Sequence, residues 1–214
     1  MLRAVTERPN RTRVPDWTVP ATLEIPLVGR APELAALGAA LSSASAGRGS
    51  VHFIAGAGGI GKTRLATAIT ERAAAQGFHS FTGRANPVET GIPYALFADA
   101  FLPFIRELQP SALQVLARGA TAELETLFPA LRQHGGAPRV SNASELKPRL
   151  LDSFTELLHR LAAREPLLLT LENLQWADPS SLELLHFVAR GAHSHRLVIV
   201  CTCTDEHADG HPNG

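Results

Sequence analysis

The sequence is poor in cysteine, carries no net charge and contains no long apolar run, and each shortage excludes a class of protein. Twenty basic residues balance twenty acidic ones, so we expect no broad positive surface for direct nucleic-acid binding. No apolar stretch is long enough to cross a membrane, and the N-terminus lacks the apolar stretch of a secretory signal. We therefore expect a cytoplasmic protein without a membrane partner.

Cys201 and Cys203 are the only cysteines, and they lie two residues apart in a strand-like segment. Their side chains would project to the same face of a strand but are badly placed for a mutual disulfide. We interpret them as reduced core thiols. A metal site with His207 and His211 is the alternative, although this spacing matches no usual zinc pattern.

The length is typical of one α/β domain. A chain of 214 residues can form such a domain with its own core. Residues 1–23 combine arginines with prolines and show no sustained apolar period, which predicts a disordered lead-in. Residues 24–206 are predicted to form the domain, and residues 207–214 a disordered tail.

Apolar periodicity predicts the order of the secondary structure. Pro148 suits the first turn of its helix, and Asp178 suits an N-cap before Pro179. Alternating strands and helices indicate a three-layer α/β fold, an open parallel sheet with helices on both faces. Strands are predicted over residues 50–55, 78–83, 167–171 and 196–202, helices over 32–45, 64–76, 146–161 and 179–188, several short helices within 93–131, and a loop over 133–142.

Residues 56–63 carry the strongest motif of the chain. They read Gly-Ala-Gly-Gly-Ile-Gly-Lys-Thr and match the phosphate-binding loop G-x-x-x-x-G-K-S/T, with a strand predicted before it and a helix after it. The glycines let backbone N–H groups approach phosphate oxygens, and the helix N-terminus adds partial positive charge. Lys62 would reach the β- and γ-phosphates, and Thr63 would ligate Mg²⁺. Together with the predicted parallel sheet, this motif indicates the fold of P-loop NTPases. A glycine-rich turn without ligand is the alternative.

Glu172 and Asn173 follow the buried strand 167–171, where a P-loop protein places an acid that holds magnesium. Glu172 can serve as this metal ligand. Asn173 stands where a second acid often activates the attacking water, and a carboxamide can orient water but cannot accept its proton. Binding of nucleotide is therefore better supported than hydrolysis. The alternative is that Glu172 is only a surface acid at a strand end.

Four segments in this order resemble the ATPase domain of the large ATP-binding LuxR-type transcriptional regulators, which belong to the STAND class of AAA-like signalling ATPases. They are Leu-Val-Gly-Arg (27–30), the loop 56–63, Gly-Ile-Pro-Tyr-Ala-Leu-Phe (91–97) and the segment 171–185 that begins Leu-Glu-Asn-Leu-Gln-Trp-Ala-Asp. The resemblance implies ATP and Mg²⁺ as cofactors and an insertion around 91–97. The nucleotide-binding residues that we expect on these grounds are Arg30, Gly56, Ala57, Gly58, Gly59, Ile60, Gly61, Lys62, Thr63 and Arg64.

The chain departs from the family pattern at three places. Members usually carry Asp-Asp where this chain has Glu172 and Asn173, and an arginine near the place of Thr204. The sheet order implied by the family is 5-1-4-3-2, followed by a winged-helix lid, but residues 205–214 are polar and give no strand signal. We therefore expect the last core strand to be lacking and the strand before the loop to form an exposed sheet edge.

Three functions remain open. The first is an ATP-binding module of a signalling ATPase, a nucleotide-dependent switch that is a fragment or a truncated member. The second is a weak magnesium-dependent ATP hydrolase in which Lys62, Glu172 and Asn173 act on the phosphates and water. The third is a non-catalytic protein that pairs through its exposed strand with a second copy or a full-length regulator.

Smaller features receive structural interpretations. Trp176 is interpreted as packing, Asp178 as a helix cap, and the stretch from Leu96 to Ile105 as core. His193 and His195 lie in a polar turn and are interpreted as solvated.

Overall fold

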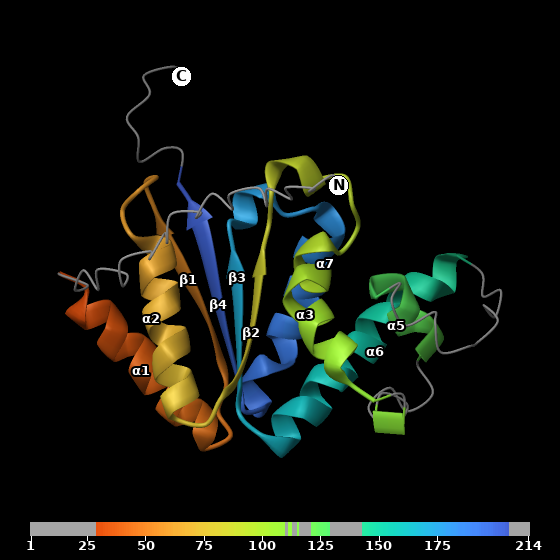
Figure 1. The fold of residues 1–214 in the computed structure, drawn as a ribbon, viewed down its shortest axis with the longest axis horizontal. Helices are drawn as coiled ribbons and strands as arrows, with labels where there is room; N and C mark the ends of the chain where they lie inside the picture. The colour runs from red at the N-terminus through yellow and green to blue at the C-terminus, as the bar shows by residue number, and fades with distance from the viewer. Residues whose placement is uncertain (1–28, 110, 113–114, 116–120, 129–142, 206–214) are drawn as a thin grey trace, which may run out of the picture.

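A computed structural model describes residues 29–109, 111–112, 115, 121–128 and 143–205. The predicted lead-in, the predicted loop over 133–142 and the predicted tail lie outside these residues. Figure 1 shows the elements. In chain order they are α1 (Ala31–Ser45), β1 (Ser50–Gly56), α2 (Lys62–Ala75), β2 (His79–Arg84), η1 (Pro87–Glu89), α3 (Ala95–Glu107), α5 (Thr121–Leu127), α6 (Ala143–Arg164), β3 (Leu167–Glu172), η3 (Leu174–Trp176), α7 (Pro179–Gly191), η4 (Ala192–Ser194) and β4 (Leu197–Thr204).

The described strands form one parallel sheet in the order β1-β4-β3-β2. Parallel pairing brings the carboxyl ends of all strands to one edge. Gly56 lies opposite Thr204, and Arg84 lies opposite Glu172. The predicted α/β fold with a parallel sheet is confirmed, and the crossovers between strands explain why helices cover both faces.

Helices α1 and α2 cover one face of the sheet, and α3, α6 and α7 cover the other (Figure 1). Successive residues of β3 point to opposite faces: Leu168 packs with the first group, whereas Leu169 and Leu171 pack with the second. All six residues of β3 are buried, as the unbroken apolar run predicted.

Aromatic side chains of α3 fill much of the second face. Phe101 stacks on Phe81 with ring centroids 4.2 Å apart and meets Phe154 edge-on at 5.2 Å. The interpretation of Leu96 to Ile105 as core is confirmed, because their apolar side chains at helical spacing are buried.

Two proline predictions are wrong. Pro103 does not divide its segment, because α3 continues through it with the ring on the exposed face. The buried side chains on the opposite face hold the helix together despite the lost backbone bond. Pro148 does not lie in a first turn, because α6 begins at Ala143 and places it one turn later. Leu150 and Phe154 are buried beyond it and anchor that helix.

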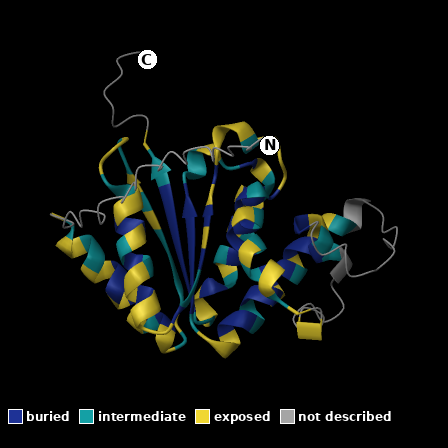
Figure 2. Ribbon diagram, viewed as in Figure 1, coloured by how far each residue is buried: buried dark blue, intermediate teal, exposed yellow. Residues whose placement is uncertain are grey.

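β1 forms an edge of the described sheet, as predicted. Figure 2 shows the contrast between this strand and the buried strands beside it. The side chain of Phe53 is 62% exposed. An open edge of this kind presents backbone groups that can pair with another strand.

The cysteines are unpaired thiols, which confirms that they form no disulfide. Cys201 is buried, and burial raises the pKa of its thiol to about 12. Cys203 is only partly buried. Across the described residues no cluster of three or more His, Cys, Asp or Glu side chains could hold a metal ion. His207 and His211 lie outside the described residues.

No described helix is long and apolar enough to cross a membrane.

Candidate functional site

The loop after β1 leads directly into α2, which begins at Lys62. Gly59 and Gly61 have φ angles of 75° and 95°, in the left-handed region that favours glycine. A Cβ atom at Gly58, Gly59 or Gly61 would meet nothing within 4 Å. The loop therefore presents an open surface at the N-terminus of a 14-residue helix, where backbone N–H groups and the helix dipole favour an anion.

Lys62 folds back over this loop. Its ammonium group donates hydrogen bonds to the carbonyl oxygens of Gly56 at 2.7 Å and Ala57 at 2.8 Å. The positive charge is thus held at the loop by neutral acceptors, which a phosphate oxygen can replace with a stronger, charge-assisted bond.

Thr63 and Glu172 meet at the end of β3. The Thr63 hydroxyl donates to Glu172 Oε2 at 3.0 Å, although the two residues are far apart in the sequence. The carboxylate is buried, with only 4% of the residue exposed. The structure therefore places the predicted acid against the predicted metal ligand of the loop. Glu172 does not lie at the surface as the alternative supposed, and its role as a metal ligand stays a prediction.

Arg84 joins the same carboxylate and was missed by sequence reasoning. Its guanidinium donates to Glu172 Oε2 at 3.2 Å. Arg84 ends β2 and lies opposite Glu172 in the parallel register. The signal that could have found it is a charged residue at the end of a strand, since the carboxyl ends of parallel strands converge.

Asn173 has a left-handed backbone with φ of 61°. Its backbone N–H donates to Thr202 Oγ1 at 3.1 Å, and its side-chain amide lies 3.5 Å from the Ala85 carbonyl. The structure therefore directs this amide toward the segment after β2. Neither of these contacts is with the loop.

Thr204 is held by a neighbouring side chain. Its backbone N–H donates to Gln175 Oε1 at 3.0 Å, and Gln175 Nε2 lies 3.3 Å from its hydroxyl. Gln175 thus fastens the end of β4 to η3, directly after β3. Thr204 stands where the family pattern places an arginine. The side chain at the carboxyl end of β4 is therefore a neutral hydroxyl.

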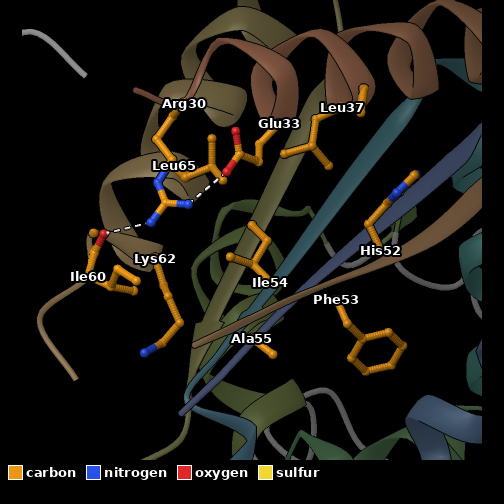
Figure 3. A pocket seen from close by; sticks show the side chains of 12 residues that line it. Arg30, Glu33, Leu37, His52, Phe53, Ile54, Ala55, Ile60, Lys62 and Leu65 are labelled. Atoms are coloured by element: carbon orange, nitrogen blue, oxygen red, sulfur yellow. Dashed lines mark hydrogen bonds and ion pairs between the residues drawn. The ribbon is translucent and has the colours of Figure 1, made fainter. Parts of the chain in front are cut away.

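Arg30 contacts the loop from the position directly before α1. Its guanidinium donates to the Ile60 carbonyl at 3.2 Å and to the Glu33 carboxylate at 2.7 Å (Figure 3). The bond from Arg30 is the main reason that the pKa of Glu33 is lowered. Arg64 lies exposed near the start of α2.

A cavity of about 270 Å³ opens beside this contact, between α1, β1 and the loop (Figure 3). Its walls combine charged groups with apolar side chains from the edge strand. The lining residues are Arg30, Glu33, Ala36, Leu37, His52, Phe53, Ile54, Ala55, Ile60, Gly61, Lys62 and Leu65.

Asp178 confirms its prediction as a helix cap. Its Oδ1 accepts hydrogen bonds from the backbone N–H groups of Ser181 and Tyr94, both at 2.9 Å. One buried carboxylate therefore starts α7 and fixes the segment before α3.

Trp176 and His195 depart in part from their interpretations. Trp176 is 40% exposed, so packing covers this residue only in part. His195 is partly buried because its ring stacks on His159 with centroids 3.6 Å apart. His193 is exposed, as predicted.

Comparison with known proteins gives two findings. Residues 26–200 match the family described as the AAA ATPase domain. An uncharacterized protein of Rhizobium meliloti (strain 1021), R02095, is 26% identical over 199 residues, which cover 86% of this chain and 19% of that protein. The chain thus spans about a fifth of the length of this relative.

Proposed function

The chain belongs to the AAA ATPase domain family, and we propose that it is a magnesium-dependent ATP-binding module whose nucleotide state acts as a switch. The observation that carries the proposal is the junction between the loop and the buried acid. Thr63, which follows Lys62 at the start of α2, bonds to Glu172 at 3.0 Å. The family match supports an ATP-binding module.

The loop would hold the phosphates through its backbone N–H groups and Lys62. Lys62 would exchange the carbonyls of Gly56 and Ala57 for phosphate oxygens, which carry more negative charge. Arg30 and Arg64 flank the loop and add positive charge. Arg30 also lies at the cavity beside β1, so it is the residue through which α1 would respond to nucleotide.

The donors around Thr63 fit magnesium. A hydroxyl and a carboxylate are hard oxygen ligands, and here their oxygens lie 3.0 Å apart. Thr63 would ligate the ion directly, and Glu172 would hold it directly or through water. Magnesium bound there would neutralise charge on the phosphates.

We propose binding rather than turnover as the main activity. Asn173, at the position of a water-activating acid, offers a carboxamide that lies toward Ala85. A carboxamide can orient water but cannot take its proton. Weak hydrolysis is the alternative, and absence of phosphate release above a Lys62→Ala control would remove it.

The resemblance to LuxR-type regulators supports a signalling role of the STAND kind for the longer protein to which such a module would belong. The exposed edge strand β1 supports a second role in association, with a second copy or a full-length regulator as partner. The specific observation is Phe53, which is 62% exposed on that strand. A chain that remains monomeric in size-exclusion chromatography and ignores such relatives would remove this second role.

Calorimetry with ATP and ADP, with and without magnesium, tests the main proposal. We expect Lys62→Ala to weaken ATP binding by about tenfold to a hundredfold, because a charged hydrogen-bond donor to phosphate is lost. Lys147→Ala is the matched control, since Lys147 lies on α6 and pairs there with Glu183. Equal binding by the wild type and Lys62→Ala would overturn the proposal.

A further inference from the structure

Arg84 and Thr63 share a single oxygen atom. Glu172 Oε2 accepts from the Thr63 hydroxyl at 3.0 Å and from the Arg84 guanidinium at 3.2 Å. The residue that would hold magnesium is therefore already bonded to a positive side chain. Arg84 comes from β2 and Thr63 from α2, so the carboxylate joins two separate elements.

The burial of Glu172 explains why it needs this partner. The Glu172 side chain is 5% exposed, whereas the side chain of Arg84 is 53% exposed. A buried carboxylate without a countercharge is costly, and an arginine at its edge offsets that cost. The pair is therefore asymmetric: the acid is fixed in the interior, and the guanidinium reaches it from solvent.

The backbone of Arg84 is anchored, while its side chain can exchange partners. The Arg84 N–H donates to Asp99 Oδ2 at 2.8 Å, and the residue is paired with Glu172 in the sheet. Two other positive groups near the loop bond to partners other than Glu172. Lys62 bonds to the loop carbonyls, and Arg30 bonds to Ile60 and Glu33.

We propose that Arg84 is a positioning residue that holds Glu172 against Thr63 and competes with magnesium for the same carboxylate oxygen. Arg84 would leave Oε2 if that oxygen ligated the ion, because both cations would need the same oxygen atom and would repel each other at that distance. Arg84 thus stabilises the protein before the metal nucleotide binds and sets the magnesium concentration at which it binds. This inference rests on the proposed function.

The test is the magnesium concentration that gives half-maximal binding of a fluorescently labelled ATP. We expect Arg84→Met to lower that concentration by about threefold or more, since a competing cation is removed. Arg84→Lys, which keeps the charge, should stay within about twofold of the wild type. Arg190→Met is the matched control, because Arg190 is exposed in the last turn of α7.

The melting temperature is a second measurement, and its response to magnesium and ATP separates this role from a structural one. Without nucleotide and magnesium, we expect Arg84→Met to lower the melting temperature, because Glu172 loses its countercharge. The double variant Arg84→Met with Glu172→Gln should recover most of that loss. Saturating magnesium and ATP should narrow the difference in melting temperature between Arg84→Met and the wild type, because the ion would then supply the countercharge of Glu172.

An unchanged or raised magnesium requirement in Arg84→Met would overturn the inference. An unchanged value would make Arg84 a structural residue, and a raised value would show that Arg84 assists binding of the metal nucleotide and does not compete with the metal. In both cases wild-type binding would leave the proposed function intact. Wild-type protein that binds no nucleotide at any magnesium concentration would overturn both.

Discussion

Strands β3 and β1 each lead to the candidate site, but their surroundings differ. β3 lies inside the sheet with all six residues buried, and it ends at Glu172. β1 lies at the edge, has no fully buried residue, and ends at the loop. The acid is therefore held by the core, whereas the loop 56–63 follows a strand that, among the described residues, pairs on one side only.

This difference separates stability from binding. Changes at the apolar residues of β3 should act mainly on the free energy of unfolding, because they remove buried apolar contacts. Changes on β1 and its loop should act mainly on nucleotide affinity and association. The division is open to test by matched substitutions on the two strands.

Leu169→Ala on β3 should have the largest effect on stability. Leu169 is fully buried between β2, β4 and the helices of the second face. We expect a loss of about 2–5 kcal/mol in the free energy of unfolding, from lost burial and the cavity left behind. Urea denaturation measures it, and a loss below about 1 kcal/mol would contradict the assignment of β3 as the centre of the core.

Asp178→Ala should have the next largest effect. The carboxylate caps α7 and also bonds the Tyr94 N–H, and the residue is 3% exposed. We expect a loss of about 1–3 kcal/mol, because three buried donors, the two backbone N–H groups and the Ser181 hydroxyl, lose their acceptor. Asp178→Asn should recover part of this loss in the same denaturation experiment. If Asn and Ala variants were equally unstable, the cap bonds would not be the cause.

Phe53→Ala on β1 should change the free energy of unfolding by less than about 0.5 kcal/mol, since the ring is 62% exposed. The same variant should weaken any self-association through the edge. Sedimentation velocity at several protein concentrations measures the self-association, and urea denaturation measures the stability. A large loss of stability in Phe53→Ala would remove the contrast between the two strands.

The stacked pair His159 and His195 should give the smallest effect, one that depends on pH. Burial, followed by the nearby His195, lowers the pKa of His159. The folded protein therefore binds fewer protons there than the unfolded chain, so stability is full above the unfolded pKa of about 6.5 and falls as the pH drops below it. His159→Gln should flatten this pH dependence, measured as the melting temperature at several pH values on both sides of about 6.5. An unchanged pH dependence in the variant would show that His159 is not its cause.

Local patterns predicted most of the fold. The glycine loop, the apolar run of β3 and the cap at Asp178 each depend on neighbouring residues, so sequence alone predicted them. The pair of Arg84 and Glu172 depends on the register between two strands, 88 positions apart in the chain. Local reasoning could not place it. Pro103 was misjudged because the packing of Phe97 and Phe101 outweighs a local break.

The exposure of Trp176 and the stack of His195 on His159 depend on which elements cover them. Residue type alone carries no such information. Sequence reasoning therefore performed best where one segment determines the structure, and worst where two distant segments meet.

A double-mutant cycle on ATP affinity tests whether the ends of β1 and β3 form one site. Its variants are Thr63→Ala, Glu172→Gln and the combination, measured by calorimetry with magnesium and with excess chelator. We predict a coupling of about 1 kcal/mol or more in magnesium, because both residues would hold the same ion, and little coupling in chelator. Additive effects under both conditions would contradict a shared metal-nucleotide site.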